Sequence, residues 1–203
     1  MIRVKDVKVP LQYDNMLLKN LISKRLKITA KEIISFSVVK RSLDAREKGN
    51  LFFVFSFDVA LKNETGKGEQ IHEDIYIPPV PTKKFRAVVV GSGPAGMFSA
   101  LVLARAGLCP LVLERGRDAD TRLKDVSAFF NSGLLDQTSN IQFGEGGAGT
   151  FSDGKLTTGT RDKHIPFVFK ELVAAGAPEE ILFSATPHIG TDKLVGIVKK
   201  LRE

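Results

Sequence analysis

The chain has 203 residues, and 30 Lys and Arg against 23 Asp and Glu give it a formal net charge of +7. Its 43% hydrophobic and 26% charged residues are typical of a globular protein. A single cysteine, Cys109, excludes an intrachain disulfide and a C-x-x-C redox pair. Because we find neither an apolar run of bilayer length nor a secretory signal, we expect a cytoplasmic protein.

The positive charge is concentrated in the N-terminal part of the chain. Residues 1–85 contain 16 Lys and Arg against 10 Asp and Glu, whereas the remainder is nearly balanced. Such an excess is compatible with a polyanion partner, but no aromatic-and-basic motif accompanies it, and an ordinary solvated surface is favoured. We therefore expect neither a nucleic-acid nor a membrane partner, and the oligomeric state stays open.

The first 61 residues predict an α+β domain with the order β-α-β-β, a small sheet with a helix on one face. The evidence is alternation of apolar and polar residues, one apolar helical face and one capping-box pattern. The predicted elements are a strand at Ile2–Pro10, a helix at Asn15–Leu26, a turn opened by Thr29 and Glu32, and strands at Ile34–Arg41 and Leu51–Leu61.

A proline-rich connector separates this domain from the rest. Residues Ile77–Thr82 read IPPVPT, and three prolines in six residues make a stiff linker. We therefore place an N-terminal basic domain at residues 1–80 and a second domain at residues 81–203.

Residues 88–114, VVVGSGPAGMFSALVLARAGLCPLVLE, predict a dinucleotide-binding βαβ unit. We expect Val88–Val90 to be a strand buried on both faces. In this motif Gly91 permits the tight turn, Gly93 lets a pyrophosphate approach the backbone, and Gly96 lets the helix pack on the strand. Glu114 ends the second strand, where its carboxylate can accept a hydrogen bond from a ribose hydroxyl.

The spacing continues past the third glycine, with Ala100, Gly107 and Glu114 in register. The complete pattern resembles the FAD-binding signature of glutathione-reductase-type flavoproteins, in which Arg115–Gly116 after the acid is also common. A second segment, SNIQFGEGGAGTFSDGKL at Ser139–Leu156, resembles a bacterial branch of FAD-dependent dehydrogenases with a small α/β domain before the flavin domain. The resemblance implies an α/β protein whose second domain is the first part of a Rossmann-like FAD-binding domain.

The second glycine loop, Gly144–Lys155, has the composition of an anion-binding nest, with Thr150 and Ser152 as hydroxyl donors and Lys155 as a cation. The resemblance implies that this loop lies against the pyrophosphate or the isoalloxazine ring. The alternative is a hinge without ligand contact. The sequence elsewhere predicts helices at about Arg122–Asn131 and at Ile165–Ala174, an irregular segment from Ser132 to about Arg161, and a helix at Asp192–Arg202 capped by Thr191.

No metal site is predicted, because His72, His164 and His188 lack ligand spacing. The segment Pro187–Leu194 resembles the same family, which raises His188 slightly as a substrate-side residue, but a surface or capping role is favoured. The catalytic acid and base remain unassigned.

These features predict an FAD-dependent oxidoreductase, with NADH or NADPH as a conceivable electron donor and an unidentified small-molecule substrate. Because no Gly-Asp dipeptide for the second half of the flavin site occurs, we expect a fragment of such an enzyme. The alternatives are a catalytically inert flavin-binding or assembly fragment, an RNA-linked flavoenzyme using its basic domain, and an NAD site in place of FAD. The predicted cofactor-binding residues are Gly91, Ser92, Gly93, Pro94, Ala95, Gly96, Glu114, Arg115, Gly146, Gly147, Thr150 and Lys155.

Overall fold

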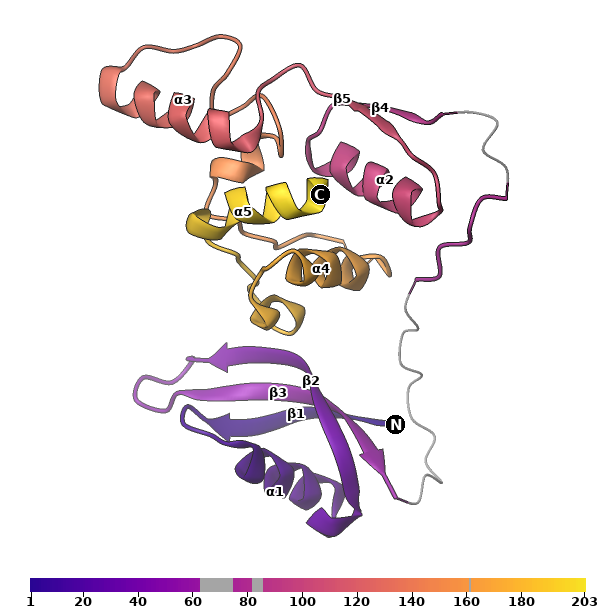
Figure 1. Cartoon of the computed structure of the whole chain (residues 1–203). Coiled ribbons are helices and arrows are strands. Elements are labelled where there is room, and N and C mark those ends of the chain that lie inside the picture. Colours follow the sequence, from indigo (N-terminus) through magenta and orange to yellow (C-terminus); the bar gives the residue numbers. More distant parts are fainter. Residues whose placement is uncertain (63–74, 82–85, 161) are drawn as a thin grey trace. The chain divides into compact units, whose positions relative to one another are not determined.

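A computed structural model describes residues 1–62, 75–81, 86–160 and 162–203 of the chain (Figure 1). These residues form two compact units. The first unit contains the described residues up to position 62 together with 182–187, and the second contains the others. The predicted domain boundary at residue 80 stays a prediction, and His72 lies outside the described residues.

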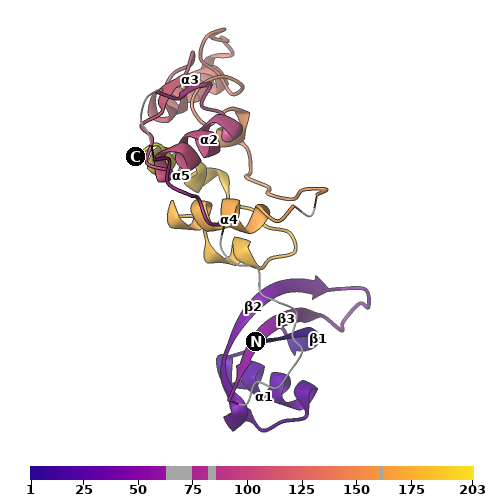
Figure 2. The same cartoon turned by 90° about the vertical axis from the view of Figure 1, so that its right-hand side faces the viewer.

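The N-terminal unit is a three-stranded antiparallel sheet with one helix on a face, as Figures 1 and 2 both show. The spatial order of the strands is β1-β3-β2, so the last strand in sequence lies in the middle. Its elements are β1 (Ile2–Pro10), α1 (Asn15–Leu26), the 3-10 turn η1 (Ala30–Glu32), β2 (Ile33–Asp44) and β3 (Phe52–Leu61). The predicted element order is confirmed, and β2 extends beyond the predicted Arg41 because it pairs with β3 as far as Asp44.

Local chemistry explains where the elements of this unit begin and end. The carboxylate of Asp14 accepts a hydrogen bond from the Leu17 N–H at 2.7 Å and caps α1. Lys27 ends α1 in the left-handed conformation, with φ of 57°. The predicted capping box is present, since Thr29 and Glu32 exchange both of its hydrogen bonds.

The core of this unit lies between α1 and the sheet. Phe55 and Phe57 of β3 stack with their ring centroids 5.3 Å apart, and Leu18 and Ile22 of α1 pack in the same cluster. A β-bulge between Val4 and Val7 of β1 keeps both valines buried while the chain between them bends.

The second unit begins with a strand, a helix and a parallel strand: β4 (Val88–Val90), α2 (Pro94–Arg105) and β5 (Leu111–Leu113). Val89 of β4 lies opposite Val112 of β5. The remaining elements are α3 (Ala119–Ser132), η2 (Ala148–Phe151), α4 (Ile165–Ala174), η3 (Glu179–Leu182) and α5 (Thr191–Arg202). Helix α5 packs against α2, α3, α4 and η2, and thereby joins the elements of this unit.

Three expectations for the second unit are wrong. Val88 and Val90 are 54% and 83% exposed instead of buried, because among the described residues only β5 pairs with β4. Helix α3 begins before Arg122, because the Asp118 carboxylate caps it by accepting from two backbone N–H groups. Gly190, with φ of 96°, occupies the N-cap position of α5, and Thr191, the predicted cap, is the first helical residue.

Among the described residues, no helix has both the length and the apolar character that a membrane span requires.

The buried aromatic stack gives a stability prediction for the N-terminal unit. Replacing Phe57, which is fully buried, with alanine removes the ring and leaves a cavity, so we expect a loss of about 3–5 kcal/mol in the free energy of unfolding. Urea unfolding followed by circular dichroism measures this loss. The matched control is Leu43→Ala at an exposed position of β2, and equal losses for the two variants would contradict the assigned core.

Candidate functional site

The first glycine segment forms the turn between β4 and α2. Gly91 has φ of 91°, a conformation that favours glycine, and its N–H donates to the Leu113 carbonyl at 2.7 Å. Gly93 is the N-cap of α2 and Pro94, which has no N–H, is the first helical residue. Because Gly93 provides no side-chain cap, the N–H groups and positive dipole of the first turn of α2 are available to an anion.

Two of these glycines differ in what surrounds them. A Cβ added at Gly96 would lie 1.9 Å from the Gly91 carbonyl oxygen, so the helix packs directly on the backbone of the turn. No heavy atom of the described residues lies within 4 Å of a Cβ added at Gly93, and its φ of −68° suits any residue. The fold therefore requires glycine at position 96, whereas the space beside Gly93 is open.

The carboxylate of Glu114 lies at the end of β5 and is oriented by the first glycine segment. Its Oε2 accepts from the Ser92 N–H at 2.6 Å and from the Ser92 hydroxyl at 2.9 Å, and its Oε1 accepts from the Gly116 N–H at 2.8 Å. Burial raises the pKa of Glu114, but these hydrogen bonds outweigh it and lower the pKa below its ordinary value. Glu114 is therefore an ionised hydrogen-bond acceptor.

The second glycine segment, Gly144–Gly147, lies directly on the first. The Gly146 N–H donates to the Ser92 carbonyl at 2.8 Å. A Cβ added at Gly147 would lie 3.3 Å from Cδ of Pro94. Two segments more than 50 residues apart in sequence thus meet at the start of α2.

A further pair of glycines, Gly116 and Gly144, lets two stretches of backbone cross closely beside Glu114. A Cβ added at Gly116 would lie 2.3 Å from the Cα of Gly144, so neither chain has room for a side chain there. This contact gives a structural reason for the glycine of the Arg115–Gly116 dipeptide. The side chain of Arg115 is exposed, with its guanidinium carbon 5.2 Å from the Phe143 ring centroid.

Arg122 is one of the residues of this region that the sequence analysis did not single out. Its side chain is fully buried on α3, and its guanidinium donates to the carbonyl oxygens of Glu145 and Gly147 at 2.5 and 3.0 Å. It also donates to the carbonyls of Asn140 and Ile141, both at 3.0 Å. The signal was helical periodicity, because Arg122 falls on the same buried face as Ala119 and Val126.

The buried carboxylate of Glu145 fastens the second glycine segment to two helices. It accepts from the Ala119 N–H at 2.7 Å, at the start of α3, and from Arg202 of α5 at 3.0 Å. An ion pair between Asp120 and Lys199, at 2.9 Å, joins the same helices nearby.

The other predicted site residues have mixed surroundings. Pro94 and Ala95 are exposed at the start of α2. Thr150 is buried and its hydroxyl donates to the Glu145 carbonyl at 3.3 Å, whereas Lys155 is exposed and pairs with Asp153 at 2.8 Å. Their proposed contacts with a cofactor stay predictions.

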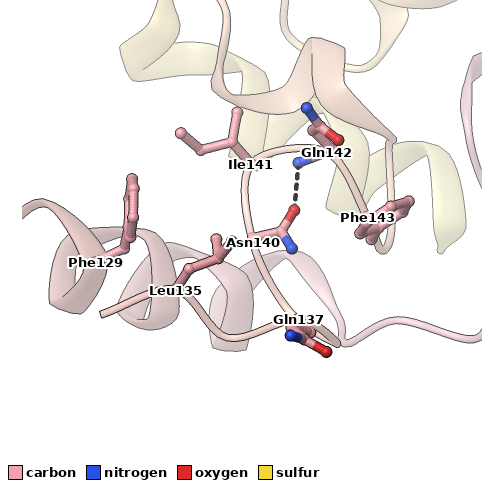
Figure 3. A pocket seen from close by; sticks show the side chains of 7 residues that line it. All are labelled: Phe129, Leu135, Gln137, Asn140, Ile141, Gln142 and Phe143. Atoms are coloured by element: carbon pink, nitrogen blue, oxygen red, sulfur yellow. Dashed lines mark hydrogen bonds between the residues drawn. The ribbon is translucent and has the colours of Figure 1, made fainter. Parts of the chain in front are cut away.

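Two cavities accompany these segments. One of about 540 Å³ is lined by Ser92, Glu114 and Gly116, by apolar residues of α2, and by charged residues that include Arg117, Asp118, Glu145, Arg202 and Glu203. The other, of about 340 Å³, lies beside the end of α3 (Figure 3). Its lining residues are Phe129, Leu135, Gln137, Asn140, Ile141, Gln142 and Phe143.

The absence of a metal site and the substrate-side role considered for His188 stay predictions. Among the described residues, no group of three or more His, Cys, Asp or Glu side chains could hold a metal ion. His164 is exposed and paired with Asp162 at 2.6 Å, and His188 is exposed.

Comparison with known families divides the chain in two. Residues 1–60 match a domain of unknown function, DUF8436, and residues 84–127 match a family described as an FAD binding domain. The second match covers the first glycine segment, Glu114 and the start of α3. It supports FAD as the cofactor.

Two relatives extend this comparison. An uncharacterized protein of Clostridium beijerinckii is 44% identical over 213 residues, an alignment that covers the whole chain and 40% of the relative. The "Probable electron transfer flavoprotein-quinone oxidoreductase YdiS" of Escherichia coli K12 is 64% identical over 36 residues, 18% of the chain and 8% of the relative. The chain thus spans less than half the length of either relative.

The two glycines at the start of α2 give contrasting stability predictions. Gly96→Ala forces a methyl group onto the Gly91 carbonyl and should lower the free energy of unfolding by about 1–3 kcal/mol or more. Gly93→Ala places its methyl group in open space and should change it by less than about 1 kcal/mol. Chemical denaturation of both variants measures the difference, and equal effects would contradict the packing at Gly96.

Glu114→Gln should make stability depend less on pH. Because the folded pKa of Glu114 is lowered, its ionised form contributes stability that is complete above its ordinary pKa of 4.5 and is lost as pH falls through the folded pKa. We therefore expect the Tm of the variant to lie below that of the wild type near neutral pH, and the gap to close in acid. The control is Glu179→Gln at an exposed position, and a gap independent of pH would contradict this account.

Proposed function

We propose that the chain carries the first half of the FAD site of an oxidoreductase that moves hydride or electrons through a non-covalently bound flavin. The observation that carries the proposal is the meeting of two glycine segments at the N-terminus of α2, beside an ionised carboxylate. The family match over residues 84–127 supports the same cofactor. The proposal includes a Rossmann-like arrangement of the domain at residues 81–203.

The residues present fit the adenosine-diphosphate part of FAD. The open space beside Gly93 admits a group to the backbone, and the uncapped start of α2 suits a pyrophosphate. In this assignment Gly91, Gly93 and Gly96 shape the phosphate turn, and Glu114 accepts a hydrogen bond from a ribose hydroxyl.

The second glycine segment extends this site in the proposal. Gly146 and Gly147 lie on Ser92 and Pro94, so a ligand that reaches past the phosphate turn meets them next. When bound, FAD supplies the redox chemistry by accepting a hydride or electrons at its ring. The chain's own residues bind and orient the cofactor, and NADH or NADPH is the proposed donor.

Titration of the purified chain with FAD, followed by flavin absorbance and fluorescence, tests this function. Gly93→Val is the decisive variant, because a Cβ at this position meets no heavy atom of the described residues within 4 Å and would enter the space proposed for the pyrophosphate. We expect saturable binding by the wild type and a loss of at least about tenfold in affinity for the variant. Riboflavin, which lacks the adenosine-diphosphate part, is the control ligand and should bind both proteins equally weakly.

Two results would contradict the proposal. One is wild-type protein that neither retains nor binds FAD. The other is a folded Gly93→Val protein that binds FAD as tightly as the wild type, which would place the ligand elsewhere.

A further inference from the structure

The search for a further role leads to Arg122, because its guanidinium is buried and, among the described residues, none of its hydrogen bonds goes to a carboxylate. Among the described residues, the hydrogen-bond partners of its guanidinium are carbonyl oxygens, and its Nε has no partner at all. The Phe151 ring centroid lies 4.8 Å from its guanidinium carbon. Burial of a charge in this way is costly and points to a task that a neutral residue cannot perform.

The acceptors of Arg122 show what that task is. Nη1 binds the carbonyls of Glu145 and Gly147, the residues on either side of Gly146. These two carbonyls therefore point toward α3, while the Gly146 N–H points toward the Ser92 carbonyl. Arg122 thus sets the direction of the peptide groups that lie on the first glycine segment.

The second nitrogen of the fork reaches a different stretch of the same loop. Nη2 binds the carbonyls of Asn140 and Ile141, which both line the smaller cavity (Figure 3). The planar guanidinium of Arg122 therefore holds residues 140–141 and residues 145–147 at a fixed distance from each other. Lysine, whose ammonium is a single point on a flexible chain, cannot bind both pairs of carbonyls in this geometry.

We propose that Arg122 is a positioning residue of the FAD site, which holds the second glycine segment in the shape that receives the part of FAD beyond the phosphate turn. This inference rests on the proposed function. Among the described residues Arg122 makes no hydrogen bond to the first glycine segment, whose turn is held by hydrogen bonds with Leu113 and Glu114. The two halves of the site should therefore respond differently when Arg122 is replaced.

The test compares the affinities of Arg122→Lys and wild-type protein for two ligands, FAD and ADP. We expect the Kd of FAD to rise by about tenfold or more and the Kd of ADP to change by less than about twofold. A shift in the visible spectrum of bound FAD should accompany the loss. Arg3→Lys is the matched control, because Arg3 makes a paired contact with Asp58 in the other unit.

Each other outcome overturns a definite part of the account. Equal FAD binding by Arg122→Lys and wild type would reject the role of Arg122 alone. Loss of ADP and FAD together would show that Arg122 supports the whole fold and does not position the second segment. Wild-type protein that binds neither ligand would reject the proposed function itself.

Discussion

The candidate site depends on one backbone hydrogen bond, from the Gly146 N–H to the Ser92 carbonyl. It joins the two glycine segments, and a Cβ added at Gly147 would lie 3.3 Å from Cδ of Pro94 across this junction. Gly96 lies on Gly91, and Gly116 crosses Gly144, at distances that leave no room for a Cβ. The glycines here are therefore of two kinds, those that let the chain pack on itself and those, such as Gly93, that leave space for something else.

Two buried charged side chains, Arg122 and Glu145, hold the second glycine segment in place. The Arg122 guanidinium gathers loop carbonyls on one side, and the Glu145 carboxylate gathers the Ala119 N–H and Arg202 on the other. Burial lowers the pKa of Arg122, while the Glu114 and Glu145 carboxylates oppose that effect, and an arginine remains charged near neutral pH. The second glycine segment is thus held by buried polar contacts with helices α3 and α5, which lie far apart in sequence.

Sequence patterns predicted the local structure well. Alternation, capping and helical periodicity gave β1, α1 and α4 with their observed ends, and glycine spacing gave the strand-helix-strand order around α2. The patterns failed where the answer depends on tertiary neighbours. The run Val88–Val90 indicated a buried strand, but burial requires neighbours on both faces, which the described residues do not provide.

The site was predictable only in part for the same reason. Glycine spacing indicated the turn at Gly91 and the acceptor Glu114, since both act within one βαβ unit. Arg122 looks like an ordinary charged residue of a polar helix, and nothing in sequence marks its carbonyl partners. The second segment meets the first through contacts between residues far apart in sequence. Its composition therefore suggested a ligand, but the sequence did not indicate that it contacts Ser92 and Pro94.

Hydrogen exchange with and without FAD, followed by mass spectrometry, tests the central claim most directly. The account predicts that peptides covering residues 91–97 and 139–151 gain protection together, while peptides from β1, β2 and β3 are unchanged. Protection confined to other parts of the chain, or no change in either glycine segment at saturating FAD, would contradict the assignment of this junction as the cofactor site.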